Sequence, residues 1–503
     1  MSGQSFRLLT ILVRKFKKGW GRITFPSFFN FSVLGNREQR KNPEIIFLLL
    51  LIMKRWNIGL EQLLKQDPIA MGMLGKQMIH EQRYRPLTYV LTTEEEDKRI
   101  YFNLLTHEMI AINFSELDLL ETRKYLVENW YLVPEQHDDQ LLVDECRAVL
   151  TLMDSWPRKI HVFHIFTTLN CNARCFYCYE KRIPGSNMTM ETAARVVEYM
   201  KEQAEDDTIE LVWFGGEPLY NYPIIDFITD GLREKGLKFH SFMYSNGFLF
   251  DNAMVEKAKN LWNLGKVQIT LDGTSQVYKK VKAYVTDVQD PFERVLQNIR
   301  SLLKAEIRVL IRLNIGMYNY LDIRDLVDYL CVNFGEEDSL KIYVTPLFES
   351  IKYADEKKEF IYDIVKELNG KLNRIFGKNK NKGFSRRIAN GSCMASGREA
   401  VTILPDGKVG ICNGMTYDVI LGDIYTTKID VKVREKFGRR FYREDKCRFC
   451  PVYPDCHIVS GCPIKDDNEG CEPVIVQMKI KEIIEKMKLR CRLGASEDEK
   501  GLT

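Results

Sequence analysis

The sequence predicts an α/β protein built around a parallel sheet that is covered by helices. Apolar, strand-like runs alternate with amphipathic, helix-like runs six times between residues 158 and 350. The apolar runs are continuous, which is typical of parallel strands buried on both faces. With 503 residues and 45% hydrophobic content, the chain is also long enough for two to four domains.

Charge and hydropathy exclude two classes of partner. The net charge of +4 is too small to indicate nucleic-acid binding, and the basic excess is local: residues 1–60 hold eleven Lys/Arg and two acidic residues. The apolar run 45–53 would rise about 13 Å as a helix, less than half the roughly 30 Å core of a bilayer. We therefore expect no integral membrane span. Residues 1–70 are interpreted as a basic extension, a membrane-surface arm or translated upstream sequence.

A small α+β domain is predicted at residues 80–155. Three short strands are expected at 86–92, 98–105 and 108–113, with an acidic turn between the first two. Two amphipathic helices, expected at 116–129 and 138–153, follow them.

The six strand–helix units define the second predicted domain, residues 158–350. It is either an open sheet or a closed barrel, and in barrel enzymes the chemistry lies at the carboxyl ends of the strands. Expected strands are 160–168, 209–216, 239–246, 267–273, 307–315 and 340–347, and expected helices are 189–204, 222–234, 252–262, 291–303 and 321–333. Residues 351–390 are predicted to be a helical linker.

Most of the thirteen cysteines fall into two groups, 171–178 and 393–471. Grouped thiols in a chain of enzyme length indicate metal binding in a reducing cytoplasm rather than a disulfide scaffold. The first group, Cys171, Cys175 and Cys178, directly follows the first predicted strand of the sheet. Three thiolates on one loop leave one iron of a four-iron cluster open for a small molecule. The alternatives are a zinc site with a distant fourth ligand, or three unrelated core thiols.

This spacing and setting resemble the radical S-adenosylmethionine (SAM) superfamily. The resemblance implies a partial (β/α)6 barrel whose catalytic cysteines, Cys171, Cys175 and Cys178, hold a [4Fe–4S] cluster with SAM on its open iron. It further implies that an electron, supplied by a donor such as flavodoxin or ferredoxin, splits SAM to a 5′-deoxyadenosyl radical.

Later loops resemble the SAM-binding loops of the same family, in the same order. "GGEP" follows the second strand, and its backbone together with Glu217 would meet the SAM amino group. Thr270 stands where relatives carry a serine near the ribose, and Lys282 stands where many carry an arginine for the SAM carboxylate. The predicted SAM contacts are Tyr177, Gly215, Gly216, Glu217, Pro218, Ser245, Asn246, Thr270, Asp272, Lys282 and Arg312.

The second cysteine group, within residues 391–475, resembles the SPASM domain, which carries auxiliary iron–sulfur clusters. Pro405, Asp406 and Gly407 predict a hairpin turn that brings Cys412 near Cys393. A zinc ribbon is the alternative for the Cys447–Cys450 pair. The resemblance implies two auxiliary clusters: a complete one on Cys447, Cys450, Cys456 and Cys471, and one with an open iron on Cys393, Cys412 and Cys462. Residues 476–503 are expected to form a helix and a tail.

These features predict a maturase that forms thioether cross-links on a ribosomally made precursor peptide. The 80–155 domain resembles a winged-helix peptide-recognition module, which would bind the leader sequence by strand addition. Sulfatase-maturating relatives carry an aspartate base directly after the thiol that matches Cys412, and this chain has Asn413 there. The alternatives are carbon–carbon cross-linking or epimerisation of a similar peptide, a sulfatase-maturating type of enzyme, and a non-catalytic iron–sulfur electron carrier.

Overall fold

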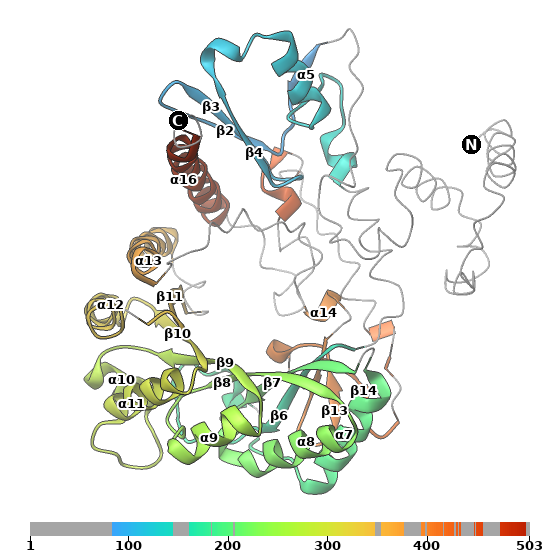
Figure 1. Ribbon diagram of the computed structural model, residues 1–503, viewed down its shortest axis with the longest axis vertical. Coiled ribbons are helices and arrows are strands. Elements are labelled where there is room, and N and C mark those ends of the chain that lie inside the picture. Colours follow the sequence, from blue (N-terminus) through green and yellow to red (C-terminus); the bar gives the residue numbers. More distant parts are fainter. Residues whose placement is uncertain are drawn as a thin grey trace, which may run out of the picture. The chain divides into compact units, whose positions relative to one another are not determined.

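A parallel sheet forms the centre of the described structure (Figure 1). Six strands stand in it in chain order, each parallel to the next. They are β6 (Val162–Thr168), β7 (Thr208–Gly215), β8 (Lys238–Ser245), β9 (Leu264–Leu271), β10 (Arg308–Ile315) and β11 (Leu340–Pro346). All six predicted strands are therefore confirmed, and with them the α/β fold class.

The computed structural model describes part of the chain, and all of that part belongs to one compact unit spanning residues 64–503. The described residues are 83–143, 160–182, 184–204, 207–335, 337–347, 354–376, 394–397, 400–415, 417–426, 429–430, 432–433, 447, 449–455 and 473–498. Two sets of predictions lie outside them: the extension at 1–70, and the metal-binding roles of Cys393, Cys456, Cys462 and Cys471.

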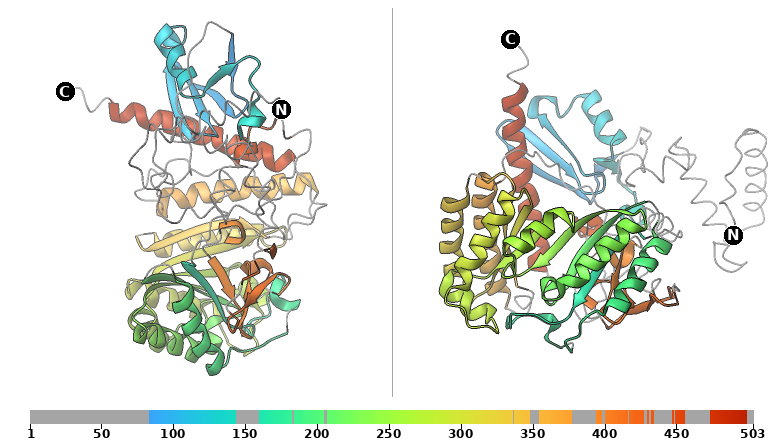
Figure 2. Two further views of the ribbon diagram at one scale, coloured as in Figure 1. Left: turned by 90° about the vertical axis from the view of Figure 1, so that its right-hand side faces the viewer. Right: turned by 60° about the horizontal axis from the view of Figure 1, so that its bottom comes forward.

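Helices cover one face of the sheet (Figure 2). The five predicted helices are present as α7 (Met190–Gln203), α8 (Tyr222–Glu234), α9 (Asn252–Asn260), α11 (Pro291–Lys304) and α12 (Tyr320–Phe334). Their starts follow capping rules: the Thr189 side chain accepts from the Thr192 amide, and Asp290 accepts from the amides of Phe292 and Glu293. A sixth helix, α10 (Ser275–Lys282), was not predicted, because its sequence "SQVYKKVK" is mostly polar.

Strand alternation divides the side chains of the sheet between two environments. On β6, Phe163 and Ile165 join the core under the helices. His164 and Phe166 therefore lie on the other face, which we call the inner face. Aromatic side chains form a row across this face. The ring centroids of Phe166 and Phe214 are 5.1 Å apart, and those of Phe214 and Tyr244 on β8 are 4.9 Å apart.

The sheet does not stop at β6. β12 (Ala400–Ile403) pairs parallel with β6, and β13 (Lys408–Gly410) and β14 (Ile420–Asp423) continue it in antiparallel fashion. Gly407, with φ of +83°, makes the predicted hairpin turn between β12 and β13. Strands from the cysteine-rich segment thus complete the barrel sheet, which crosses the predicted domain boundary at residue 391.

The predicted amino-terminal strands are present as a three-stranded antiparallel sheet. β2 (Val90–Glu95), β3 (Lys98–Asn103) and β4 (Glu108–Asn113) pair in chain order. β1 (Tyr84–Pro86) pairs with β5 (Leu132–Pro134), and α5 (Leu120–Glu128) lies between them in sequence. The second predicted helix is described only to residue 143, so its extent stays a prediction, as does the winged-helix assignment.

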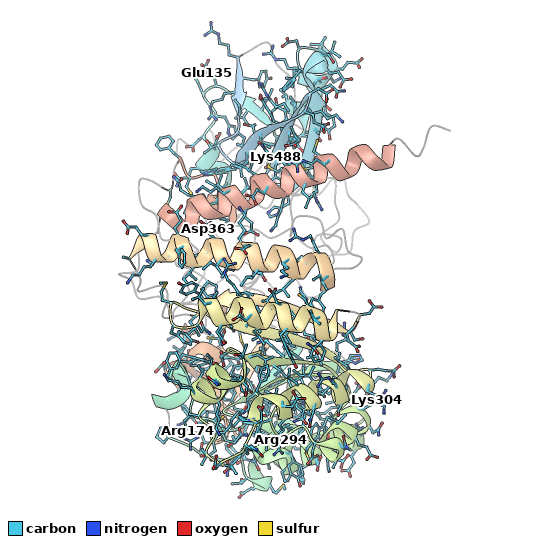
Figure 3. The ribbon with its side chains drawn as sticks, turned by 90° about the vertical axis from the view of Figure 1, so that its left-hand side faces the viewer. Glu135, Arg174, Arg294, Lys304, Asp363 and Lys488 are labelled. Carbon is cyan, nitrogen blue, oxygen red and sulfur yellow. The ribbon has the colours of Figure 1, made fainter. Side chains whose placement is uncertain are left out.

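Two long helices follow the barrel strands in sequence: α13 (Asp355–Phe376), in the predicted linker, and α16 (Pro473–Asp498), the predicted terminal helix (Figure 3). The ion pairs Lys366–Glu485 and Lys481–Glu359 join them. Further along α16, Arg492 donates to Glu95 on β2 at 2.6 Å. Within the described ranges, none of the helices combines the length and the apolar character needed to cross a membrane.

Candidate active site

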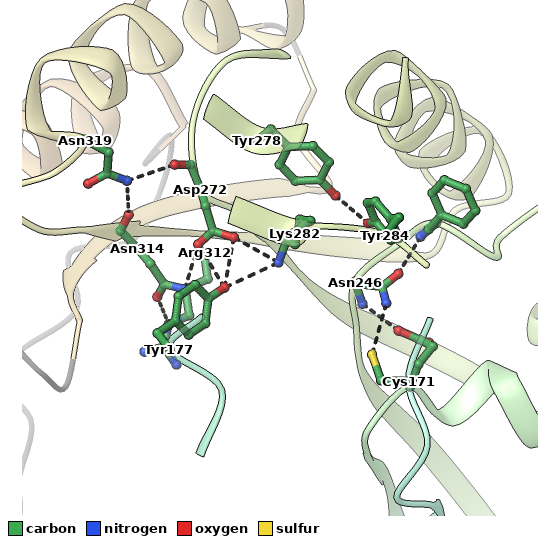
Figure 4. Close-up of polar contacts among 12 residues, drawn as sticks. Cys171, Tyr177, Asn246, Asp272, Tyr278, Lys282, Tyr284, Arg312, Asn314 and Asn319 are labelled. Carbon is green, nitrogen blue, oxygen red and sulfur yellow. Dashed lines mark hydrogen bonds and ion pairs between the residues drawn. The ribbon is translucent and has the colours of Figure 1, made fainter. Parts of the chain in front are cut away.

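The cysteine loop crosses the carboxyl end of β6, where the sequence placed it. Cys171, Cys175 and Cys178 are all half-buried, and the Cys178 amide donates to the Cys175 carbonyl at 3.2 Å, which makes a tight turn. Two N–H groups approach the Cys171 sulfur: the Ala173 amide at 3.4 Å and the Asn246 side chain at 3.9 Å (Figure 4). N–H groups directed at sulfur stabilise a thiolate, the form that ligates iron.

Burial has the opposite effect on the same sulfur. It raises the pKa of the Cys171 thiol to about 12, and the nearby Glu217 carboxylate adds to the increase. Such a thiol becomes a thiolate at neutral pH only when a cation sits beside it. Three thiols on one loop, one of them with two N–H donors, thus fit an iron–sulfur cluster.

Backbone and amide contacts hold this loop in place from two sides. The Arg174 amide donates to the Lys282 carbonyl, and the Val285 amide donates to the Asn172 carbonyl, both at 2.8 Å. The Asn172 side chain accepts from Asn246 at 2.6 Å. The end of α10 and the loop after β8 therefore fix where the cysteines lie. Asn172 was not predicted as a site residue, although it stands within the cysteine motif.

A buried network lies under the loop (Figure 4). The Asp272 carboxylate accepts from the Tyr177 hydroxyl at 2.9 Å and pairs with the Lys282 ammonium at 3.0 Å. The Lys282 and Asp272 side chains are 3% and 0% exposed. Burial by itself would lower the pKa of Lys282, but the charge of Asp272 outweighs it and raises that pKa well above its usual value. Asn314 completes the network by donating to the same carboxylate at 3.0 Å.

Residues of the neighbouring strands extend this network. Arg312 Nε donates to the Asn314 side chain at 2.9 Å, and Thr270 is the register partner of Arg312 on β9. Asn319 donates to the main-chain carbonyls of Asp272 and Asn314 at 2.8 and 3.0 Å. Asn319 was not predicted either, because it lies on a loop with no motif of its own.

Glu217 ties the loop after β7 to the end of β8. It is fully buried, and it accepts from the Ser245 hydroxyl at 2.9 Å and from the Asn246 amide at 2.8 Å. Burial raises the pKa of Glu217 to about 7, and these donors oppose the increase. Pro218 follows and begins the 3₁₀ turn η5 (Pro218–Asn221).

The two glycines before Glu217 leave no room for a side chain. A Cβ on Gly216 would lie 2.3 Å from the Asn170 carbonyl oxygen, and one on Gly215 would lie 2.2 Å from that of Thr168. Gly215 also has φ of +115°, a conformation that favours glycine. Glycine at both positions allows the β7 loop to touch the chain just before Cys171.

The predicted SAM contacts lie in the last four residues of β7 to β10 or in the segments that follow β6 to β9, with Lys282 at the end of α10. Glu217, predicted to bind the SAM amino group, accepts hydrogen bonds from Ser245 and Asn246 in this structure. Lys282, predicted to bind the SAM carboxylate, contacts Asp272 and Tyr177. Their contacts with SAM stay predictions.

The second cysteine group is described in part. Cys412 and Cys447 are buried and Cys450 is half-buried, and the Cys450 amide donates to the Cys447 carbonyl at 3.2 Å. The described cysteines form no disulfide, and no three His, Cys, Asp or Glu side chains among the described residues gather as a site for a single ion. The assignment of these thiols to auxiliary clusters stays a prediction.

Part of the barrel matches a known protein family. Residues 165–330 match the family model described as Radical SAM superfamily. A GTP 3′,8-cyclase of Clostridium perfringens is 26% identical over 310 residues, covering 58% of this chain and 93% of the relative. The radical SAM cyclopropyl synthase TigE of Paramaledivibacter caminithermalis is 23% identical over 59% of this chain and 67% of its own length.

A solved structure shows the same fold. It is described as native anSMEcpe with bound AdoMet and Kp18Cys peptide, and it superimposes with a TM-score of 0.50 at 19% identity. The superposition covers 67% of this chain and 99% of that protein.

Proposed function

We propose that this protein, whose residues 165–330 match the Radical SAM superfamily model, is a radical SAM peptide maturase that forms thioether cross-links on a ribosomally made precursor. The observation that carries the proposal is the loop with Cys171, Cys175 and Cys178. Its three half-buried thiols stand at the carboxyl end of the first barrel strand, next to the buried Asp272–Lys282 pair.

The side chains divide the work of the site as follows. Cys171, Cys175 and Cys178 would hold a [4Fe–4S] cluster, which together with SAM supplies a 5′-deoxyadenosyl radical. Tyr177 and Lys282 anchor the loop to Asp272. The half-buried rings of Phe214 and Tyr244, 4.9 Å apart on the inner face, would limit access of water to a radical formed on that face.

A peptide is the substrate class that the neighbours favour. The anSMEcpe structure has a bound peptide, Kp18Cys, and its fold is the one found here. In the sheet β2–β3–β4, β4 is an edge strand among the described residues, because it pairs with β3 alone. An edge strand offers unpaired backbone N–H and C=O groups to an extended leader peptide.

The choice of a thioether rests on the cysteine-rich segment. Cross-linking a thiol to carbon removes two hydrogens: one leaves as an atom to the 5′-deoxyadenosyl radical, and the other leaves as a proton with an electron. An auxiliary iron–sulfur cluster held through Cys412 would supply an acceptor for that electron. Sulfatase-maturating relatives carry an aspartate base at the position of Asn413, and an amide cannot act as that base. Sulfatase-type oxidation is therefore disfavoured. Carbon–carbon bond formation is the alternative, and the name of TigE favours it.

The first test asks whether the chain cleaves SAM. Protein purified and reconstituted without oxygen should turn brown and, with a reductant and SAM, should release 5′-deoxyadenosine. Cys175→Ala should abolish that release. Colourless protein that holds only zinc would refute the proposal, and the electron-carrier alternative requires a coloured protein that makes no 5′-deoxyadenosine.

The second test identifies the product. A cysteine-containing precursor peptide co-expressed with this protein should lose about 2 Da per cross-link, and alkylation should show one cysteine thiol consumed per link. A 2 Da loss with all thiols still reactive would indicate carbon–carbon bonds instead. GTP serves as the control substrate, and its cyclisation would overturn the peptide assignment. The electron donor, of flavodoxin or ferredoxin type, and the reducing cytoplasm stay predictions.

A further inference from the structure

A polar cluster joins the barrel to the residue that follows Cys412. The Asn413 side chain donates from Nδ2 to His164 Nδ1 on β6 at 2.8 Å. The Thr402 hydroxyl on β12 donates to Asn413 Oδ1 at 3.1 Å. His164 and Thr402 are register partners across the β6–β12 pair, so neighbouring strands present both side chains to one amide.

These contacts fix the state of each group. Because Nδ2 of an amide can only donate, His164 Nδ1 must accept, and the proton of the neutral ring must lie on Nε2. Burial lowers the pKa of His164 to about 4, so the ring is neutral at pH 7. In this arrangement Asn413 accepts from Thr402 and donates to His164, so both ends of its side-chain amide are hydrogen-bonded.

The cysteine beside this amide is held by regular structure as well. Cys412 is buried and lies two residues after β13, and Asn413 begins the 3₁₀ turn η7 (Asn413–Met415). The β-hairpin holds the main chain just before Cys412. The hydrogen bonds of the Asn413 side chain hold the main chain just after it. Ligands on rigid elements, supported by oriented hydrogen bonds, are the arrangement that metal sites favour.

We propose that His164 and Thr402 are positioning residues for an iron–sulfur cluster bound through Cys412, and that they act by holding the amide of Asn413. The inference rests on the auxiliary cluster of the proposed function. Sulfatase-maturating relatives carry a base at the position of Asn413. In this chain Asn413 would instead orient the ligand Cys412, and His164 on β6 is its hydrogen-bond partner.

The test removes the competing cluster first. In the full chain carrying Cys171→Ala, Cys175→Ala and Cys178→Ala, only auxiliary clusters can form. On this background, His164→Leu should weaken retention of iron against a chelator about 10-fold and should change the EPR spectrum of the reduced protein. His164→Asn should restore both readouts, because its side-chain oxygen stands where Nδ1 stands in histidine and can accept from Asn413. Thr402→Val should act like His164→Leu, and Thr402→Ser should act like the unchanged residue.

Controls separate this role from a general loss of stability. His240 also stands on a barrel strand and lies 3.5 Å from an asparagine amide, that of Asn263, so His240→Leu should leave iron retention and EPR unchanged. Cys412→Ala should remove the EPR component that His164→Leu alters, and Cys447→Ala should leave that component in place. Unaltered iron retention and EPR in His164→Leu, or no rescue by His164→Asn, would overturn the inference.

The same background separates this inference from the proposed function. If it binds no iron at all, the auxiliary clusters do not exist and the inference falls with them. Release of 5′-deoxyadenosine by the unmodified protein would still support the radical SAM part of the proposal.

Discussion

Asp139 shows at the scale of a residue how partners can reverse the effect of burial. Its carboxylate accepts from Arg85 at 2.8 and 3.0 Å, from the Thr88 amide at 2.8 Å, and lies 2.8 Å from the His137 ring. Burial alone would raise the pKa of Asp139, but these donors hold it well below its usual range. The carboxylate thus ties the chain after β5 to the chain around β1.

We expect Asp139→Asn to destabilise this domain at pH 7 by about 3 kcal/mol, because charged hydrogen bonds are lost. A lowered pKa stabilises the fold above the unfolded value near 3.9, and that stability is lost as pH falls through the folded value. The difference between variant and wild type should therefore narrow below pH 4. Hydrogen exchange of residues 84–90 and 132–139 at pH 7 and at about pH 2.5 measures this difference, and a difference of the same size at both pH values would contradict the prediction.

The Asp272–Lys282 pair lies deeper, and its loss should cost more. Asp272→Asn leaves an ammonium that is 3% exposed without its countercharge, which costs about 3–5 kcal/mol. Urea unfolding followed by circular dichroism gives the change, and Glu306→Gln in the exposed Lys259–Glu306 pair is the control with little effect. A loss no larger than in that control would show that the pair does not stabilise the barrel.

At the scale of an element, the close approach of the β7 loop to the cysteine loop is the most sensitive feature. The Cβ of Gly216→Ala would meet the Asn170 carbonyl at 2.3 Å and the Leu169 carbonyl at 2.8 Å, and both are backbone atoms that must move. Because Asn170 directly precedes Cys171, the cluster ligands move with it. We expect Gly216→Ala to lose the iron bound by Cys171, Cys175 and Cys178, and therefore to stop cleaving SAM.

The matched control is Gly265→Ala on β9, where an added Cβ meets nothing within 4 Å. It should keep its iron content and its activity. Iron analysis and 5′-deoxyadenosine release on both variants decide the point. Equal behaviour of the two variants would mean that the loop contact does not position the cluster.

Helix α10, which was not predicted, shows why the local sequence pattern does not reveal every helix. α10 has three lysines in eight residues, yet Tyr278, Val281 and Lys282 are buried. Its last residue, Lys282, carries the charge that pairs with Asp272. An apolar stripe predicts a helix, but a buried lysine looks polar in sequence, and only the tertiary fold supplies the partner that makes its burial possible.

At the scale of the whole molecule, β12 to β14 extend the sheet beyond β6. Without them the backbone edge of β6 would be unpaired, and an exposed edge invites aggregation. A chain ending at residue 376 should therefore aggregate more than one ending at residue 430, which keeps all three strands. Both lack α16, so its absence does not contribute to the difference. Size-exclusion chromatography at equal concentration measures the difference, and equal monomer content would contradict the prediction.

The sequence by itself determined the alternation of strands and helices, the loop with Cys171, Cys175 and Cys178, and the order of the motifs after each strand. These are local signals: apolar runs, turn residues and spacing along the chain are written in consecutive residues. The same signals placed the predicted SAM contacts at one edge, because carboxyl ends of parallel strands meet there.

Only the tertiary structure decided how that edge is held together. The bonds of Asp272 with Tyr177 and Lys282, and of Asn413 with His164 and Thr402, join residues from 10 to 249 positions apart. The pairing of β12 with β6 also belongs to this class. Such contacts depend on which strands become neighbours, and that choice is made by burial of the whole core rather than by any short stretch of sequence.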